Sequence, residues 1–203
     1  QLSTLVGERQ QITDKQLAGV GATQVFSAFE RACAKQGMLS ASFPITHHLL
    51  DADAGPETSK ERVSFITVLQ DNANNSIVSI INEADAMNDK ELMRLLFGFE
   101  YEIDNDLLAA HIAKAMHADS LTLWKREGGL RDDSDAYIAE ITSSTIQQYR
   151  DMLSTRAKSD TGRGGPVTTL DALELAARSG VETRVTGVSD DMTGVNETRL
   201  VIG

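Results

Sequence analysis

The sequence predicts an α/β fold in which a mainly parallel sheet carries helices on both faces. Segments with the periodicity of amphipathic helices alternate along the chain with short, mostly apolar runs of strand length. Two of those runs, 77–81 and 121–124, are each separated from the next by a helical pattern, which favours parallel pairing. The chain has 203 residues, enough for a hydrophobic core, and we expect a single domain over residues 1–203.

The first predicted helix covers 13–36, where apolar side chains recur at helical spacing and Gly37 provides a C-terminal stop. Residues 39–43 alternate between apolar and polar side chains, which predicts a strand. Pro44 lacks a backbone N–H, so we expect it to end that strand. A second helix is predicted from 58, at the start of a capping box, to about 74.

The remaining elements follow the same alternation as far as the C-terminus. A turn is expected at Gly128-Gly129, a charged loop at 131–135 and a glycine-rich loop at 158–166. Further helices are predicted at 88–97, 104–116, 137–141, 144–153 and 168–178, and further strands at 77–81, 121–124, 181–186 and 200–202.

The composition excludes several classes of protein. Hydrophobic residues make up 41% of the chain and charged residues 24%, so the chain is neither disordered nor membrane-spanning. The net charge of -11 argues against nucleic acid as a partner, because such proteins need a basic face. Cys33 is the single cysteine, which excludes an intrachain disulfide and fits a cytoplasmic location.

Amide and carboxylate side chains occur near the ends of two predicted strands. Asn82 and Asp85 follow the strand at 77–81, and Asn105 and Asp106 open the helix that leads to the next strand. In open α/β sheets, ligands bind outside the carboxyl ends of parallel strands. Such groups can hold the ammonium and carboxylate of an amino acid, and capping or turn formation is the alternative.

The glycine-rich loop before the helix at 168–178 is a candidate phosphate-binding segment. Glycines let backbone N–H groups approach a phosphate, and a helix N-terminus adds a favourable partial charge. The candidate residues are Gly162, Arg163, Gly164 and Gly165. The loop is neither a Walker A motif nor a dinucleotide fingerprint, and a plain flexible connection is the alternative.

Two adjacent histidines, His47 and His48, also resemble metal ligands. Neither has a partner at helical spacing, so we expect solvent-facing loop histidines and no metal site made by protein side chains.

These motifs together resemble the amino acid kinase family, and within it the glutamate 5-kinases. Those enzymes have Ile-Asn-Glu-Asn-Asp-Ala where this chain has Ile-Asn-Glu-Ala-Asp-Ala at 81–86, and Gly-Asp-Asn-Asp where this chain has Ile-Asp-Asn-Asp at 103–106. Their Leu-Ala-Ala-Val-Gly stretch resembles Leu-Ala-Gly-Val-Gly at 17–21, and a glycine-rich loop before an alanine-rich helix follows in both.

The resemblance implies a three-layer α/β/α sandwich that uses ATP and Mg²⁺ to phosphorylate the side-chain carboxylate of glutamate, a step of proline biosynthesis. It implies that Asn82, Asp85 and Asn105 contact the amino acid and that Asp106 orients catalytic lysines or the metal. It also implies that the loop at 162–165 lies along the nucleotide phosphates. Relatives are oligomeric, so we expect a homo-oligomer.

The sequence departs from the family pattern at three places. A Thr-Asp pair before the Gly-Leu turn is replaced by Lys125-Arg126, and the lysine of a Gly-Thr-Gly-Gly-Met-x-Thr-Lys run is replaced by Thr169. The family's first strand, with its Lys-x-Gly motif, does not occur, so we expect an N-terminally incomplete sandwich. Three interpretations stay open: a glutamate-phosphorylating kinase, a pseudokinase that binds a small amino acid or a kinase partner without catalysis, and an α/β domain of unrelated function.

Overall fold

The structure is a computed structural model that describes residues 14–46, 49, 56–84, 105–155, 165–188 and 196–202. The chain divides into two compact units, Gln1–Glu100 and Tyr101–Gly203, and each is described by itself. A membrane-spanning helix is absent from the part of the chain that the structure describes.

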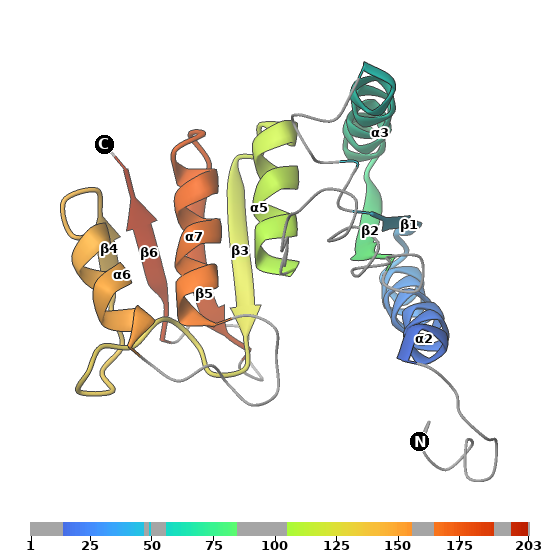
Figure 1. Ribbon diagram of the computed structural model, residues 1–203. Coiled ribbons are helices and arrows are strands. Elements are labelled where there is room, and N and C mark those ends of the chain that lie inside the picture. Colours follow the sequence, from blue (N-terminus) through green and yellow to red (C-terminus); the bar gives the residue numbers. More distant parts are fainter. Residues whose placement is uncertain are drawn as a thin grey trace, which may run out of the picture. The chain divides into compact units, whose positions relative to one another are not determined.

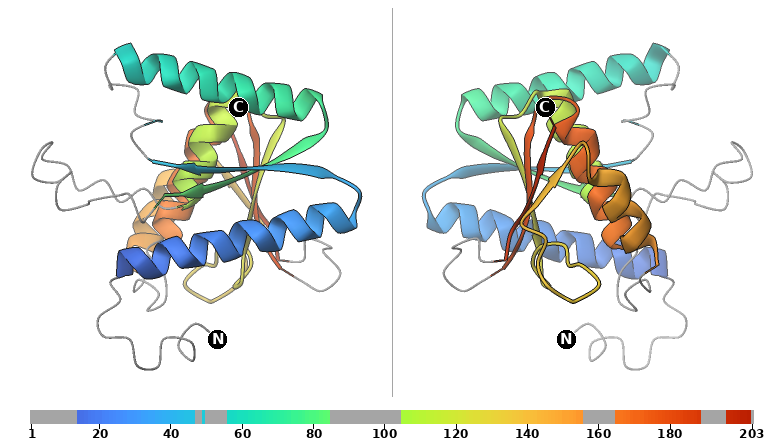
Figure 2. Two further views of the ribbon diagram at one scale, coloured as in Figure 1. Left: turned by 90° about the vertical axis from the view of Figure 1, so that its right-hand side faces the viewer. Right: turned by 90° about the vertical axis from the view of Figure 1, so that its left-hand side faces the viewer.

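The first unit is a pair of parallel strands between two helices. Its elements in chain order are α2 (Asp14–Lys35), β1 (Leu39–Ile45), α3 (Pro56–Asn74) and β2 (Ile77–Glu83). The strands β1 and β2 pair in parallel from Leu39↔Ile77 to Ile45↔Glu83. Both views of the ribbon place α2 and α3 on opposite sides of this pair (Figures 1 and 2).

Side chains of neighbouring residues in β1 contact different helices, which explains why both faces of the β1–β2 pair are covered. The side chain of Phe43 points to α3, where its ring meets that of Phe65 edge-on with centroids 5.7 Å apart. Ser42, one residue earlier, points to α2 and donates a hydrogen bond to Glu30 Oε1 at 3.0 Å. Successive side chains of a strand point to opposite faces. The expectation that Pro44 ends the strand was wrong, since Pro44 pairs with Asn82 and β1 continues to Ile45.

The second unit is a four-stranded sheet in the order β3-β5-β6-β4. The strands are β3 (Ser120–Lys125), β4 (Glu140–Thr142), β5 (Glu182–Gly187) and β6 (Thr198–Val201). The pairings β3–β5 and β4–β6 are parallel, and β5–β6 is antiparallel. Three of the four strand pairings in the two units are thus parallel. The predicted α/β class with a mainly parallel sheet is confirmed.

Three helices cover one face of the second unit's sheet (Figures 1 and 2). They are α5 (Asn105–Met116), α6 (Ile146–Ser154) and α7 (Pro166–Ala177). The helices α5 and α7 lie side by side and make many contacts with each other. The core beneath them is closed around large apolar side chains that are less than 2% exposed, namely Ile141, Leu153, Leu170, Leu173 and Val185.

Some predicted elements differ from those in the structure. The helix predicted at 137–141 was wrong, because the chain is extended there and continues as β4. Pairing with β6 and a hydrogen bond from Arg199 N to Ala139 O hold this segment extended. The helix α7 begins at Pro166 rather than at 168, with Pro166 in the first turn, where a proline is tolerated. The helix predicted at 88–97 lies outside the described residues.

Most of the helices that lead into strands end on a residue with positive φ. After α2 this residue is Gly37, and hydrogen bonds from Gly37 N to Ala34 O and from Met38 N to Cys33 O complete a Schellman motif. After α5 the same place is taken by His117, with φ of 49°, and the bonds from His117 N to Lys114 O and from Ala118 N to Ala113 O are equivalent.

We expect His117→Gly to stabilise the second unit by about 0.5–1 kcal/mol, because a left-handed conformation is strained for a residue with a Cβ. Urea unfolding followed by the fluorescence of Trp124, the only tryptophan of the chain, measures this change. A lower unfolding midpoint in the glycine variant would contradict the strain at this position.

Candidate functional site

The candidate site of the second unit is built around Asp106. This aspartate lies in the first turn of α5, and only 8% of its surface is exposed. A carboxylate is favourable there, because the N-terminus of a helix carries a partial positive charge. The helix α5 leads into β3 and runs back along it, so its N-terminus lies at the carboxyl end of that strand.

Side chains from two further elements meet at the same carboxylate oxygen. The ammonium Nζ of Lys125, the last residue of β3, lies 2.5 Å from Asp106 Oδ2. The hydroxyl of Thr169, in the first turns of α7, donates a hydrogen bond to Oδ2 at 2.8 Å. We call these three residues the Asp106 cluster. The cluster joins a strand end to two helix N-termini, so α5, β3 and α7 all determine its geometry.

The members of the Asp106 cluster differ in their access to solvent. The side chain of Asp106 is 11% exposed and that of Lys125 is 29% exposed, while Thr169 is buried. The part of the cluster that solvent reaches is therefore mainly the side chain of Lys125. Charge-assisted contacts of this kind are short and strong, and the partly buried aspartate limits the positions available to the ammonium.

The segment before α7 is partly described. Gly165 is the N-cap residue of α7, in an extended conformation, and its carbonyl accepts hydrogen bonds from the backbone N–H and the hydroxyl of Thr169 at 3.1 and 3.4 Å. No side-chain cap is bonded to this helix start. The candidates Gly162, Arg163 and Gly164 lie outside the described residues.

The amino-acid candidates are divided between the two units. Asn82 lies near the end of β2, half-buried, and its amide donates to the carbonyl of Glu83 at 3.3 Å. Asn105 is the first residue of α5 and is exposed. Asp85, like His47 and His48, lies outside the described residues. Within the described ranges, no group of three or more His, Cys, Asp and Glu side chains is arranged to hold a metal ion.

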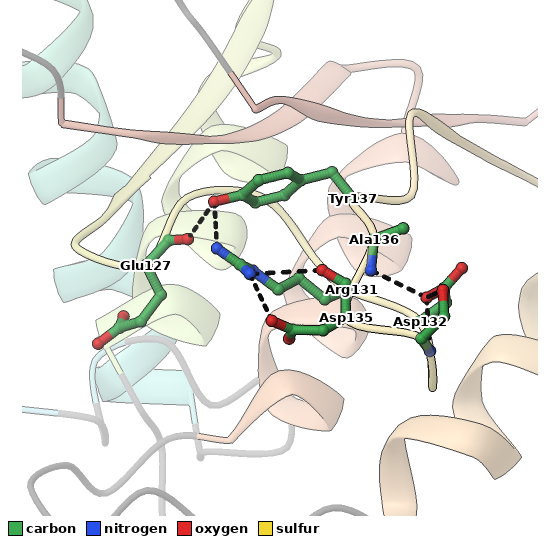
Figure 3. A network of polar contacts seen from close by, with 7 residues as sticks. Glu127, Arg131, Asp132, Asp135, Ala136 and Tyr137 are labelled. Atoms are coloured by element: carbon green, nitrogen blue, oxygen red, sulfur yellow. Dashed lines mark hydrogen bonds and ion pairs between the residues drawn. The ribbon is translucent and has the colours of Figure 1, made fainter.

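The loop that follows β3, directly after Lys125, is held by a network of polar contacts (Figure 3). The guanidinium of Arg131 lies over the ring of Tyr137, 4.2 Å from its centroid, and donates to the Tyr137 hydroxyl at 2.5 Å. It also pairs with Asp135 Oδ2 at 2.8 Å. The Tyr137 hydroxyl donates to the carbonyl of Glu127 at 3.0 Å, which closes the loop. Such a network holds the chain in place just beyond the cluster's lysine.

The start of this loop is also attached to β6. The backbone N–H of Gly129 donates to Asn196 O at 2.7 Å, and that of Leu130 donates to the Thr198 hydroxyl at 2.8 Å. A Cβ at position 129 would lie 2.7 Å from Asn196 O and 2.9 Å from Thr198 N. Because both of those atoms are backbone, the loop has to move to admit any side chain.

We therefore expect Gly129→Ala to destabilise the second unit by about 1–3 kcal/mol, the usual cost of overpacking. Urea unfolding followed by Trp124 fluorescence measures it. The control is Gly21→Ala in α2, where a Cβ would meet no described atom within 4 Å. That change is expected to be neutral or stabilising by circular dichroism, because alanine favours helix. Equal effects of the two substitutions would contradict the close approach at Gly129.

His111 of α5 makes the stability of the second unit depend on pH. Burial lowers the pKa of His111 below its ordinary value, and the nearby Lys114 ammonium lowers this pKa further. The unfolded chain thus binds the proton more tightly than the folded chain. The stability that His111 contributes is present above about pH 6.5, the ordinary histidine pKa, and is lost as the pH falls through the lowered pKa.

We expect the free energy of unfolding to be lower at about pH 5 than at about pH 7.5, and the difference to shrink in His111→Gln. Urea titrations at both pH values measure this. An unchanged pH dependence in the variant would assign the effect to other groups.

Sequence reasoning placed Asp106 in the site but treated Lys125 and Thr169 as departures from a pattern. One signal pointed to Lys125: it is the last residue of a predicted parallel strand, where ligands of α/β proteins bind. Nothing local pointed to Thr169, because its contact joins residues 63 positions apart. Glu83, a buried carboxylate at the end of β2, was also passed over.

Comparison with known proteins adds a family to this geometry. The model of the amino acid kinase family matches residues 3–187. Among curated relatives, the glutamate 5-kinase of Azoarcus sp. (strain BH72) is 30% identical over 171 residues, 82% of this chain and 42% of the relative. That of Marinomonas sp. (strain MWYL1) is 31% identical over 173 residues, 83% of this chain and 42% of the relative. The chain thus spans less than half the length of these relatives.

Solved structures of low sequence identity share the fold. Carbamate kinase from Giardia lamblia bound to AMP-PNP matches 99% of this chain and 79% of its own, with a TM-score of 0.58 and 12% identity. UMP kinase from Ureaplasma parvum matches 98% of this chain and 75% of its own, with a TM-score of 0.52 and 12% identity. The resemblance stated from the motifs is confirmed at the level of family and fold.

Proposed function

We propose, since this chain belongs to the amino acid kinase family, that it transfers the γ-phosphoryl group of ATP to the side-chain carboxylate of glutamate or a similar amino acid. The glutamate 5-kinase relatives support the choice of acceptor. The resulting acyl phosphate is an intermediate of the kind that proline biosynthesis requires.

One observation carries this proposal: the contact of 2.5 Å between Lys125 Nζ and Asp106 Oδ2 at the carboxyl end of β3. A carboxylate acceptor is already a nucleophile, so the reaction needs no general base. The barrier lies in bringing two anions together and in stabilising the charge of the transferring group, which is achieved by positioning and by positive charge. A lysine held by a buried aspartate supplies both.

The other residues are assigned the roles that the resemblance to the family implies. Asp106 is a positioning residue, and Gly162, Arg163, Gly164 and Gly165 are assigned to binding of the nucleotide phosphates. Asn82, Asp85 and Asn105 hold the amino acid through its ammonium and carboxylate groups. Magnesium would be brought to the site with ATP, and it would supply positive charge that offsets the charge of the phosphates.

The test is formation of glutamate hydroxamate from glutamate, MgATP and hydroxylamine by the complete gene product that carries this sequence. We expect a hydroxamate signal that depends on both glutamate and ATP. Absence of this product, with release of ADP also absent, would overturn the proposal. Size-exclusion chromatography with light scattering tests the homo-oligomer that we propose, and fractionation of cells tests the cytoplasmic location.

A pseudokinase is the second candidate, and Thr169 favours it. The hydroxyl of Thr169 is neutral and binds Asp106 at a position where the family motif has a lysine. In that case, glutamate would raise the thermal unfolding midpoint without any turnover of MgATP. Turnover with glutamate would rule this candidate out.

A further inference from the structure

Two departures from the family motifs meet at one carboxylate. The motifs place a threonine at the end of the strand that is β3 here, and a lysine in the first turns of the helix that is α7 here. This chain has the reverse, Lys125 on β3 and Thr169 on α7. Both side chains contact the same oxygen, Asp106 Oδ2, at 2.5 and 2.8 Å.

We propose that lysine and threonine have exchanged places around Asp106, so that Lys125 binds the nucleotide phosphates and Thr169 positions Asp106. This inference rests on the proposed function for its ligand, a nucleoside triphosphate. It goes beyond that function by assigning the phosphate-binding cation to β3 instead of α7.

Exposure supports this division of roles. Only Lys125 in the Asp106 cluster has substantial exposed side-chain surface, 29%, whereas Thr169 is 4% exposed. An ammonium has three N–H donors, and the contact with Asp106 occupies one of them. In β5, the residue paired with Lys125 is Gly187, which has no side chain to cover that of Lys125. Phosphate oxygens can therefore approach Lys125 but not Thr169.

The buried hydroxyl explains why a threonine is needed at position 169. A partly buried carboxylate requires hydrogen-bond donors, and the ammonium of Lys125 meets only part of that need. The Thr169 hydroxyl donates the second bond to Oδ2 and is itself anchored beside Gly165 O. Removing the hydroxyl would loosen the aspartate without removing any charge.

The experiment is a double-mutant cycle in the complete gene product, with K125T, T169K and K125T/T169K. The readout is the affinity for Mg-AMP-PNP by calorimetry, which requires no turnover. We expect K125T to weaken binding about tenfold or more, as loss of a charge-assisted phosphate contact does. The double variant should bind within about threefold of the wild type, since it restores one cation and one hydroxyl at Asp106.

Circular dichroism confirms folding of each variant before affinities are compared. If the double variant does not fold, K125M and T169V replace it: K125M should lose about tenfold in affinity and T169V about threefold or less. Wild-type affinity in K125T or K125M, a folded double variant that binds no better than K125T, or a larger loss in T169V than in K125M would overturn the exchange.

This readout separates the exchange from the proposed function. A wild-type protein that binds Mg-AMP-PNP through Lys125 and forms no glutamate hydroxamate would leave the exchange in place and overturn the phosphoryl transfer. A wild-type protein that fails to bind Mg-AMP-PNP would overturn the exchange itself.

Discussion

Asp106→Asn is expected to lower the rate of hydroxamate formation by about a hundredfold, the typical cost of removing one preorganised electrostatic group from such a site. Asparagine keeps the size of the side chain and can still accept a hydrogen bond from Thr169. It cannot neutralise Lys125, whose ammonium lies 2.5 Å from the carboxylate that is replaced. The lysine then loses its fixed position, and transfer slows because positioning is most of the catalysis.

Initial rates over a range of glutamate concentrations measure this effect. The loss should appear mainly in kcat, because Asp106 positions the lysine that stabilises the transferring group and does not bind glutamate. Asp133→Asn is the matched control: it removes an exposed carboxylate from the loop after β3. That control should keep the wild-type rate. An Asp106→Asn rate within about threefold of the wild type would contradict a positioning role.

Leu173→Ala is expected to lower the free energy of unfolding of the second unit by about 3–4 kcal/mol. Leu173 is fully buried in the helix α7, within the core that α7 shares with the sheet. Removing its side chain leaves a cavity that the other side chains of that core fill only in part.

Leu175→Ala is the control for this prediction, since it is the same change in the same helix. Leu175 is only partly buried against the core, so we expect less than about half the effect of Leu173→Ala. Urea unfolding followed by Trp124 fluorescence gives both values. Equal losses from the two substitutions would show that α7 presents a different face to the core.

Local signals were sufficient to predict most of the described elements. The apolar runs that became β2, β3 and β5 and the helical patterns that became α2, α5 and α7 were recognised, because their residues carry the periodicity of the structure they form. Gly37 and Gly180 were recognised as helix stops, and both have positive φ. The prediction at 137–141 failed because pairing with β6, about 60 residues away, holds that segment extended.

The candidate site could be predicted only in part, because its contacts join distant segments. Residue types alone placed Asp106 at a helix start, which is correct. The meeting of positions 106, 125 and 169 is a property of the packed unit, so the sequence showed two of those residues only as substitutions. The roles of Asn82, Asp85, Asn105 and the loop at 162–165 stay predictions.

The buried alanines of α5 and α7, two helices that pack against each other, have a consequence for how this protein can evolve. Each helix contributes two of them to the core of the second unit, Ala110 and Ala113 from α5 and Ala172 and Ala176 from α7. Small side chains allow two helix axes to come close, and that spacing fixes how far apart the first turns lie. A bulkier residue at one of these four positions would push Asp106 and Thr169 apart without altering either one. The size of these buried side chains and the geometry of the Asp106 cluster are therefore linked. Substitutions at the alanine positions are limited by the cluster, although the alanines are not part of it.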